Sequence, residues 1–138
     1  GFWVIAMNSR PPAAWQLIAA LLVWVVAMAG ESLADRQLDR HRRRPENRGQ
    51  VCRQGLWRYS RHPNYFFETL HWLAYLPLAI GAPWAWLALL PPVIVAWLLL
   101  RMSGLPLTEV QAAATRPGYA DYITTTSAFV PWPPRRPR

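Results

Sequence analysis

Residues 55–68 read Gly-Leu-Trp-Arg-Tyr-Ser-Arg-His-Pro-Asn-Tyr-Phe-Phe-Glu, and this stretch joins a basic loop to an apolar segment. Pro63 suits the first position of a helix, because the N–H group that proline lacks would have no helical partner there. Four polar residues then follow on one face of the predicted helix: Asn64, Glu68, His71 and Tyr75. Polar side chains are costly on a helix that crosses a membrane, so this face predicts a functional site.

The composition favours a membrane protein of one domain over a soluble one. The 138 residues are 53% hydrophobic and include 9 Trp, yet the net charge is +8. All fifteen basic residues are arginine, which binds phosphate groups through two parallel hydrogen bonds better than lysine does. The single Cys52 excludes a disulfide framework and a cysteine-based metal site, and we expect no metal.

Hydropathy predicts three membrane spans, at about residues 13–30, 64–80 and 84–101. Pro77 is expected to kink the second span. The chain opens with Gly-Phe-Trp-Val-Ile-Ala-Met, which is typical of the end of a preceding membrane helix and not of a signal peptide. We therefore expect an all-α, multi-pass transmembrane helical bundle, of which residues 1–138 form the C-terminal portion. Some catalytic residues are then expected outside this sequence.

The loop at 31–61 and the tail at 102–138 hold thirteen of the fifteen arginines. The positive-inside rule places both in the cytoplasm, and the two spans between them agree with that placement. The first helix is expected to continue into the loop and to end before Pro45. Short cytoplasmic helices are predicted at 107–115 and at about 119–124, before a proline-rich end.

The predicted helix start at Pro63 is also suited to an anion, because free N–H groups and the helix dipole favour negative charge there. Arg58, Arg61 and His62 flank it. The aromatic residues nearby are expected to form an interfacial belt, except Tyr65 at the mouth of the site. The arginines could equally be topology signals or contacts to anionic lipid headgroups. The residues alone predict a cavity, open to the cytoplasm, for a phosphate-bearing ligand, and they leave the reaction open.

Residues 55–68, followed by Trp72, resemble the signature of the steroid 5-alpha-reductase-like superfamily, in particular its uncharacterised bacterial branch. Further stretches agree in order along the chain: Glu-Ser-Leu-Ala-Asp-Arg-Gln at 31–37, Pro-Glu-Asn-Arg-Gly at 45–49, Ser-Gly-Leu-Pro-Leu-Thr-Glu at 103–109, Arg-Pro-Gly-Tyr-Ala-Asp-Tyr at 116–122, and the ending at 125–134. The Arg-His-Pro-Asn-Tyr core alone is shared in variant form with isoprenylcysteine carboxyl methyltransferases. The ordered set is more specific.

The resemblance implies that the C-terminal half of a membrane protein builds an NADPH site. The positions of this sequence that match cofactor-contacting positions are Asp35, Arg42, Arg58, Arg61, His62, Asn64, Tyr65 and Glu68, and more loosely Arg101, Glu109, Tyr119 and Tyr122. Asn64 and Glu68 match positions nearest the reactive nicotinamide end. No complete catalytic set is expected within these residues, and the catalytic acid stays unknown.

The implied function is NADPH-dependent reduction of a conjugated carbon–carbon double bond in a lipid-like substrate of steroid or isoprenoid type. The implied location is the bacterial inner membrane, with the loop and C-terminus cytoplasmic. Two alternatives stay open: an S-adenosylmethionine-dependent methyltransferase on a related membrane fold, and a non-catalytic protein that binds anionic lipid. Membrane lipid is an expected partner in each case, no nucleic acid is expected, and the oligomeric state is not predicted.

Overall fold

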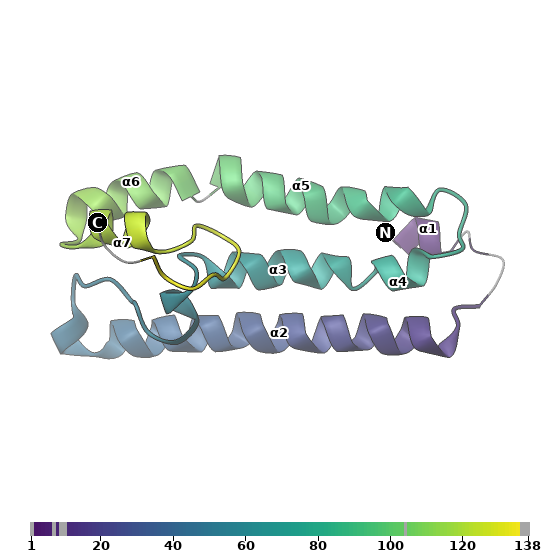
Figure 1. Ribbon diagram of the computed structural model, residues 1–138, viewed down its shortest axis with the longest axis horizontal. Helices are drawn as coiled ribbons and strands as arrows, with labels where there is room; N and C mark the ends of the chain where they lie inside the picture. The colour runs from purple at the N-terminus through teal and green to yellow at the C-terminus, as the bar shows by residue number, and fades with distance from the viewer. Residues whose placement is uncertain (1, 7, 9–10, 104, 136–138) are drawn as a thin grey trace.

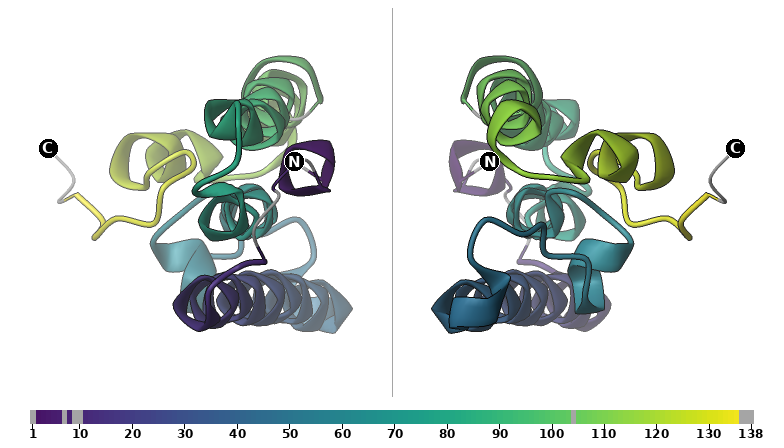
Figure 2. Two further views of the ribbon diagram at one scale, coloured as in Figure 1. Left: turned by 90° about the vertical axis from the view of Figure 1, so that its right-hand side faces the viewer. Right: turned by 90° about the vertical axis from the view of Figure 1, so that its left-hand side faces the viewer.

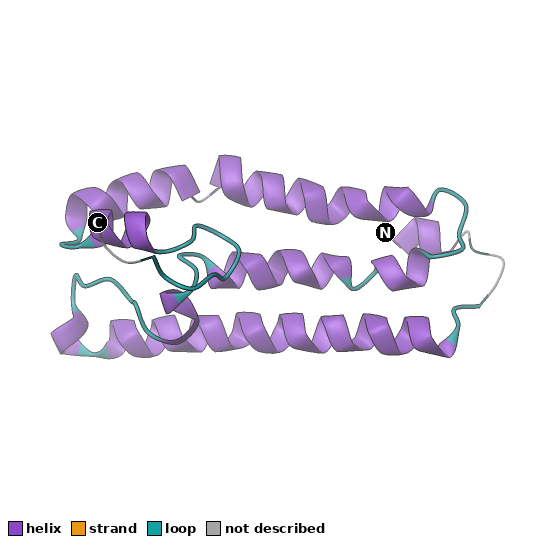
Figure 3. Ribbon diagram, in the orientation of Figure 1, coloured by secondary structure: helices purple, strands orange, loops and turns teal. Residues whose placement is uncertain are grey.

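The computed structural model describes residues 2–6, 8, 11–103 and 105–135, and every regular element among these residues is helical. Figure 1 shows an elongated stack in which α2 forms one side, α3 and α4 the middle, and α5 and α6 the other side. Figure 3 shows that loops join these helices at the two ends of the stack. The prediction of an all-α fold is confirmed.

The helix α2 (Ala14–Arg43) is 30 residues long, which corresponds to about 45 Å. Among the described residues it is the one helix long and apolar enough to cross a membrane, with a mean hydropathy of 2.1 over its apolar window. It continues well past residue 30 and ends before Pro45, as predicted. A short 3-10 helix, η1 (Pro45–Asn47), follows it.

The predicted second span is two helices, α3 (Pro63–Leu73) and α4 (Leu76–Ala79). The expected kink at Pro77 is a complete break, because the proline has no N–H group and its ring would collide with the carbonyl of Leu73. The side chain of Gln16 in α2 donates hydrogen bonds to the carbonyls of Pro77 and Ile80, at 2.7 and 3.0 Å. The carbonyl of Pro77 also accepts the N–H of Ile80, so the Gln16 bonds attach the C-terminal end of α4 to α2.

The predicted third span begins with η3 (Ala85–Leu89), continues as α5 (Leu90–Leu98) and ends in the π-helical turn η4 (Leu99–Ser103). The short α1 (Phe2–Ala6) packs against this end of the stack, where Val4 contacts a buried cluster of small residues: Ala79, Ala82 and Ala88. Figure 2 shows α1 beside the α4–α5 connection. The structure therefore supports a membrane-length helix for the first predicted span only.

Small residues allow α2 and α3 to pack closely. Gly30 faces the ring of Phe67 so tightly that an added Cβ atom would overlap that ring. Ala27 and Ala34, one turn on either side of Gly30, are completely buried. Figure 1 shows the two helices running in opposite directions, so the start of α3 lies beside the C-terminal half of α2. Close approach of helix backbones at small residues is typical of membrane bundles.

The C-terminal region returns to the start of α3. Helices α6 (Leu105–Thr115) and α7 (Tyr119–Thr125) match the predicted short helices within two residues. Residues 127–135, here named the strap, then run beside the segment before α3 (Figure 1). The N–H of Arg61 donates to the carbonyl of Ser127 at 2.8 Å, and the N–H of Trp132 donates to the carbonyl of Tyr59 at 2.9 Å. Backbone hydrogen bonds therefore hold the strap in place.

Candidate functional site

A cavity of about 500 Å³ lies where the C-terminal half of α2, the start of α3 and the α6–α7 pair meet. This volume is within the range of small-molecule binding sites. Its lining residues come from three stretches that are distant in sequence, at 35–42, 51–65 and 111–122: Asp35, Leu38, Arg42, Val51, Cys52, Trp57, Arg61, His62, Asn64, Tyr65, Gln111, Ala112, Thr115, Arg116, Tyr119 and Tyr122. The site is therefore built by tertiary packing.

One wall of the cavity is the 3-10 helix η2 (Gly55–Arg58), which α2 holds in position. The N–H of Leu56 donates to the side chain of Gln37, and the indole N–H of Trp57 donates to the carbonyl of Ala34, both at 2.9 Å. Gly55 adopts a positive φ of 58° and packs directly against Gln37. A side chain at Gly55 would be strained and would displace the Gln37 side chain, which accepts the N–H of Leu56.

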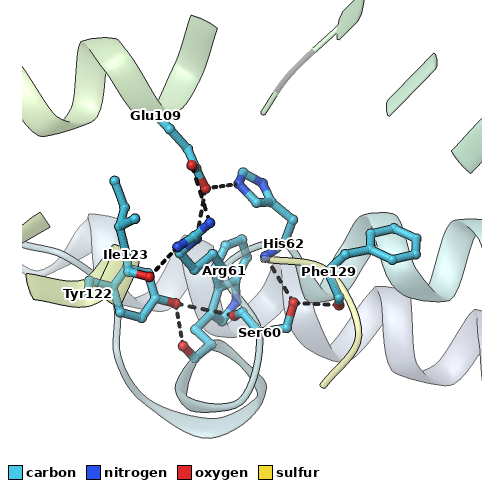
Figure 4. Close-up of polar contacts among 8 residues, drawn as sticks. Ser60, Arg61, His62, Glu109, Tyr122, Ile123 and Phe129 are labelled. Carbon is cyan, nitrogen blue, oxygen red and sulfur yellow. Dashed lines mark hydrogen bonds and ion pairs between the residues drawn. The ribbon is translucent and has the colours of Figure 1, made fainter. Parts of the chain in front are cut away.

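Tyr122 attaches α7 to the same wall. Its hydroxyl donates to the carbonyl of Trp57 and lies 3.2 Å from the carbonyl of Ser60 (Figure 4). Burial raises the pKa of Tyr122 well above its usual value, so the phenol is protonated and is a hydrogen-bond donor at neutral pH. The ring of Tyr119 packs edge-on against Tyr122, with the ring centres 5.8 Å apart.

A Tyr122→Phe variant is expected to unfold with a free energy lower by about 1 kcal/mol, because two buried carbonyls lose a hydrogen-bond donor while the ring packing stays. Thermal denaturation of the purified protein measures this change. Tyr59→Phe is the matched control, since Tyr59 is exposed. Equal effects of the two changes would show that the Tyr122 hydroxyl does not hold α7.

At the edge of the cavity, Glu109 of α6 contacts Arg61 and His62 (Figure 4). The Glu109 carboxylate lies 2.8 Å from Nε of Arg61, without the alignment of a hydrogen bond there, and accepts one from a terminal nitrogen of Arg61 at 3.4 Å. His62 lies 3.3 Å from the same carboxylate. The three side chains are only 9%, 12% and 16% exposed for Arg61, His62 and Glu109. Arg61 also donates to the carbonyl of Ile123 at 2.6 Å.

The charge of this group is balanced within the protein. Burial lowers the pKa of His62, and the nearby Glu109 only partly opposes that effect. His62 is therefore mostly neutral at pH 7, and the positive charge of Arg61 balances the negative charge of Glu109. Arg61 is therefore not a free positive group for a ligand, and a ligand anion would have to bind other arginines of the cavity.

Arg42 and Arg116 line the cavity and have no ion-pair partner among the described residues. Asp35 is the one acidic residue among the described lining residues. The buried Oδ1 atom of Asn64 lacks a hydrogen-bond partner in the part of the chain that the structure describes. The rings of His62 and Tyr65 stack at 5.3 Å with an angle of 11° between them. These groups can bind an anion, a hydrogen-bond donor and a flat ring.

The cavity brings together eight of the twelve residues that the resemblance assigns to a cofactor: Asp35, Arg42, Arg61, His62, Asn64, Tyr65, Tyr119 and Tyr122. Glu109 contacts two of them. The described lining residues do not include Arg58, Glu68 or Arg101. Arg58 lines a separate hollow, Arg101 is exposed in η4, and Glu68 lies one turn further along α3 than Asn64. Whether any of the twelve binds a cofactor stays a prediction.

Half of the lining was not predicted: Leu38, Val51, Cys52, Trp57, Gln111, Ala112, Thr115 and Arg116. The expectation of an interfacial belt is wrong for Trp57, which is buried and bonded to α2. Cys52 is also buried, which raises the pKa of its thiol. Arg116 could have been suspected as the one arginine between α6 and α7. The remaining residues have no distinctive signal in the sequence.

Residues 2–126 match the family model described as "Protein of unknown function (DUF1295)". No curated protein and no solved structure matches the chain. The family match covers most of the 138 residues and includes every element that lines the cavity. The chain therefore belongs to this family of unknown function, which in general is steroid 5-alpha-reductase-like.

Proposed function

We propose that this chain forms the cofactor site of a multi-pass membrane oxidoreductase that uses NADPH to reduce a conjugated carbon–carbon double bond in a lipid-like substrate. The observation that carries the proposal is the cavity, in which Arg42 and Arg116 have no ion-pair partner among the described residues. Arginine binds phosphate groups well, and NADPH has three of them. The nature of the reaction rests on the resemblance to the superfamily.

Exposed apolar surface supports the multi-pass part of the proposal. Val93, Ile94 and Trp97 of α5 are all exposed, and α2 exposes a long row of large apolar side chains: Leu17, Ile18, Leu21, Leu22, Val25 and Val26. Apolar surface of this extent requires lipid or further protein. The arginine-rich loop and the strap lie at the same end of the stack (Figure 1). The positive-inside rule makes that end cytoplasmic, in the bacterial inner membrane implied by the resemblance.

The residues of the cavity fit NADPH. Arg42 and Arg116 would hold phosphate groups, and the carboxylate of Asp35 could accept a hydrogen bond from a ribose hydroxyl. The unpartnered Oδ1 of Asn64 could accept one from a carboxamide, and the stacked ring pair at His62 offers an aromatic surface to a flat ring. When bound, NADPH supplies the hydride.

The chain's own residues bind and orient in this scheme. Asn64 and Tyr65 at the start of α3 set the orientation of the ligand, and Trp57 closes the wall toward α2. Glu109 fixes Arg61 and His62, so these two side chains keep one arrangement when the ligand enters. No described residue is assigned here as the acid that protonates the substrate.

The test is thermal denaturation of the full-length protein in detergent. NADPH at about one hundred times its Kd should stabilise the protein by about 2.7 kcal/mol, and S-adenosylmethionine should have no effect. NADH lacks the extra phosphate and should stabilise less. Arg42→Gln and Arg116→Gln should each reduce the effect of NADPH, because each removes a phosphate-binding group.

Arg48→Gln is the matched control, since Arg48 is an exposed loop arginine outside the lining of the cavity. It should respond to NADPH as the unchanged protein does. Stabilisation by S-adenosylmethionine and not by NADPH would contradict the proposal and favour a methyltransferase. Stabilisation by neither, with a response to acidic lipid alone, would favour a non-catalytic lipid-binding protein.

A further inference from the structure

The strap presents an apolar surface outside the cavity. Trp132 is 66% exposed and Val130 is 52% exposed, and the neighbouring Tyr59 is also exposed. We name these three side chains the strap patch. The hydrogen bond from the N–H of Trp132 to the carbonyl of Tyr59 holds the patch together. The hydroxyl of Ser60 also donates to the carbonyl of Phe129 at 2.8 Å, so the exposed side chains stand on a fixed backbone (Figure 4).

Ring contacts place the strap near the end of the apolar part of α2. Gly30 is the last residue of that apolar segment, and Phe67 packs against it. Phe66 lies 5.2 Å from Phe67 and 5.9 Å from Phe129 of the strap, measured between ring centres. In the proposed membrane arrangement, this position corresponds to the boundary between lipid tails and headgroups. Figure 2 shows the strap on one flank of the helical stack, where it is open to its surroundings.

A hollow of about 310 Å³ lies between the strap residue Pro134, α7 and the end of η2. Its lining residues are Arg53, Arg58, Tyr122, Thr125, Thr126 and Pro134. Arg53 is paired with Asp121 at 2.9 Å, whereas Arg58 has no ion-pair partner among the described residues. Arg58 directly precedes Tyr59 of the strap patch in the chain, and it shares the hollow with Pro134 of the strap.

We propose that the strap patch and this hollow together bind an anionic membrane phospholipid. The lipid phosphate contacts Arg58, while Trp132, Tyr59 and Val130 lie among the headgroups and the first carbons of the tails. Trp and Tyr favour this depth, and arginine pairs strongly with phosphate. The strap has no acidic residue that would repel an anionic lipid. The inference rests on the proposed membrane location but not on NADPH binding.

A fluorophore attached at Val130→Cys tests the depth of the strap. The experiment uses the full-length protein with Cys52→Ala, reconstituted in vesicles that contain phosphatidylglycerol, and lipid with a spin label close to the headgroup. We expect strong quenching at position 130 and little at Gln50→Cys, the matched control on an exposed loop residue. Equal quenching at both positions would overturn the inference. The absence of quenching at position 130 would also overturn it, provided that alkaline carbonate does not extract the protein from the vesicles.

The charge of the site is tested by comparing vesicles of phosphatidylglycerol and of phosphatidylcholine. Arg58→Gln should reduce the preference for the anionic lipid about fivefold, because each arginine near an anionic surface contributes about 1 kcal/mol. Inorganic phosphate should not compete. Competition by inorganic phosphate would identify a site for free phosphate and would reject the lipid. Extraction of the protein by alkaline carbonate would show that it is not embedded in the membrane. That result would contradict both this inference and the multi-pass part of the proposed function.

Discussion

An Arg61→Met variant is expected to unfold with a free energy lower by about 3–5 kcal/mol, because it leaves a buried carboxylate without its cation. Glu109 has no other arginine contact among the described residues, and it is 16% exposed. The variant also removes the hydrogen bond from Arg61 to the carbonyl of Ile123. Both losses act where α6 and α7 meet the start of α3. Chemical denaturation in detergent, followed by circular dichroism, measures the change.

The exposed ion pair between Arg43 and Asp39 provides the matched control, since its side chains are 77% and 56% exposed. Arg43→Met should cost no more than about 1 kcal/mol. Adding Glu109→Met to Arg61→Met should restore much of the lost stability, because the double variant contains no unpaired buried charge. A cost for Arg61→Met no larger than that for Arg43→Met would show that the ion pair does not attach α6.

The Arg61–Glu109 pair changes how the basic stretch at residues 55–68 is understood. The sequence predicts that Arg58 and Arg61 flank an anion site at the start of α3. In the structure Arg61 is already balanced by Glu109, and Arg58 lies in a different hollow. The unpaired positive charge at the cavity instead comes from Arg42 on α2 and Arg116 beyond α6. The local pattern thus points to the start of α3, where a cavity lies, but it does not identify the arginines of that cavity that have no ion-pair partner among the described residues.

The helices could be predicted because their signals are local. A proline at a helix start, an apolar run and a spacing of three or four residues each concern neighbours in the chain. The pairing of Arg61 with Glu109 connects positions 48 apart, and the position of Cys52 depends on the path of an irregular loop. Neither follows from periodicity. The break before Pro77 has a local cause, but the bond from Gln16 that attaches α4 to α2 joins positions 61 apart.

A Gly30→Leu variant is expected to destabilise the protein by about 3 kcal/mol, at the upper end of the usual cost of overpacking. Even a Cβ atom at Gly30 would overlap the ring of Phe67. Ala27 and Ala34 are buried on either side of Gly30, so the overlap cannot be relieved by a movement at Gly30 alone. The two helices must therefore separate along their contact. Thermal denaturation of the full-length protein in detergent measures the loss.

The same variant is expected to weaken ligand binding, because Asp35 and Arg42 reach the cavity from α2 while Asn64 reaches it from α3. If α2 and α3 separate, groups that must contact one ligand are displaced from each other, so NADPH should stabilise the variant less than the unchanged protein. Ala29→Leu is the control, since residue 29 is adjacent on α2 and exposed. An equal loss of stability in both variants would mean that a larger side chain anywhere on this part of α2 is harmful. A loss confined to Gly30→Leu, with reduced binding, would show that the contact between Gly30 and Phe67 sets the shape of the cavity.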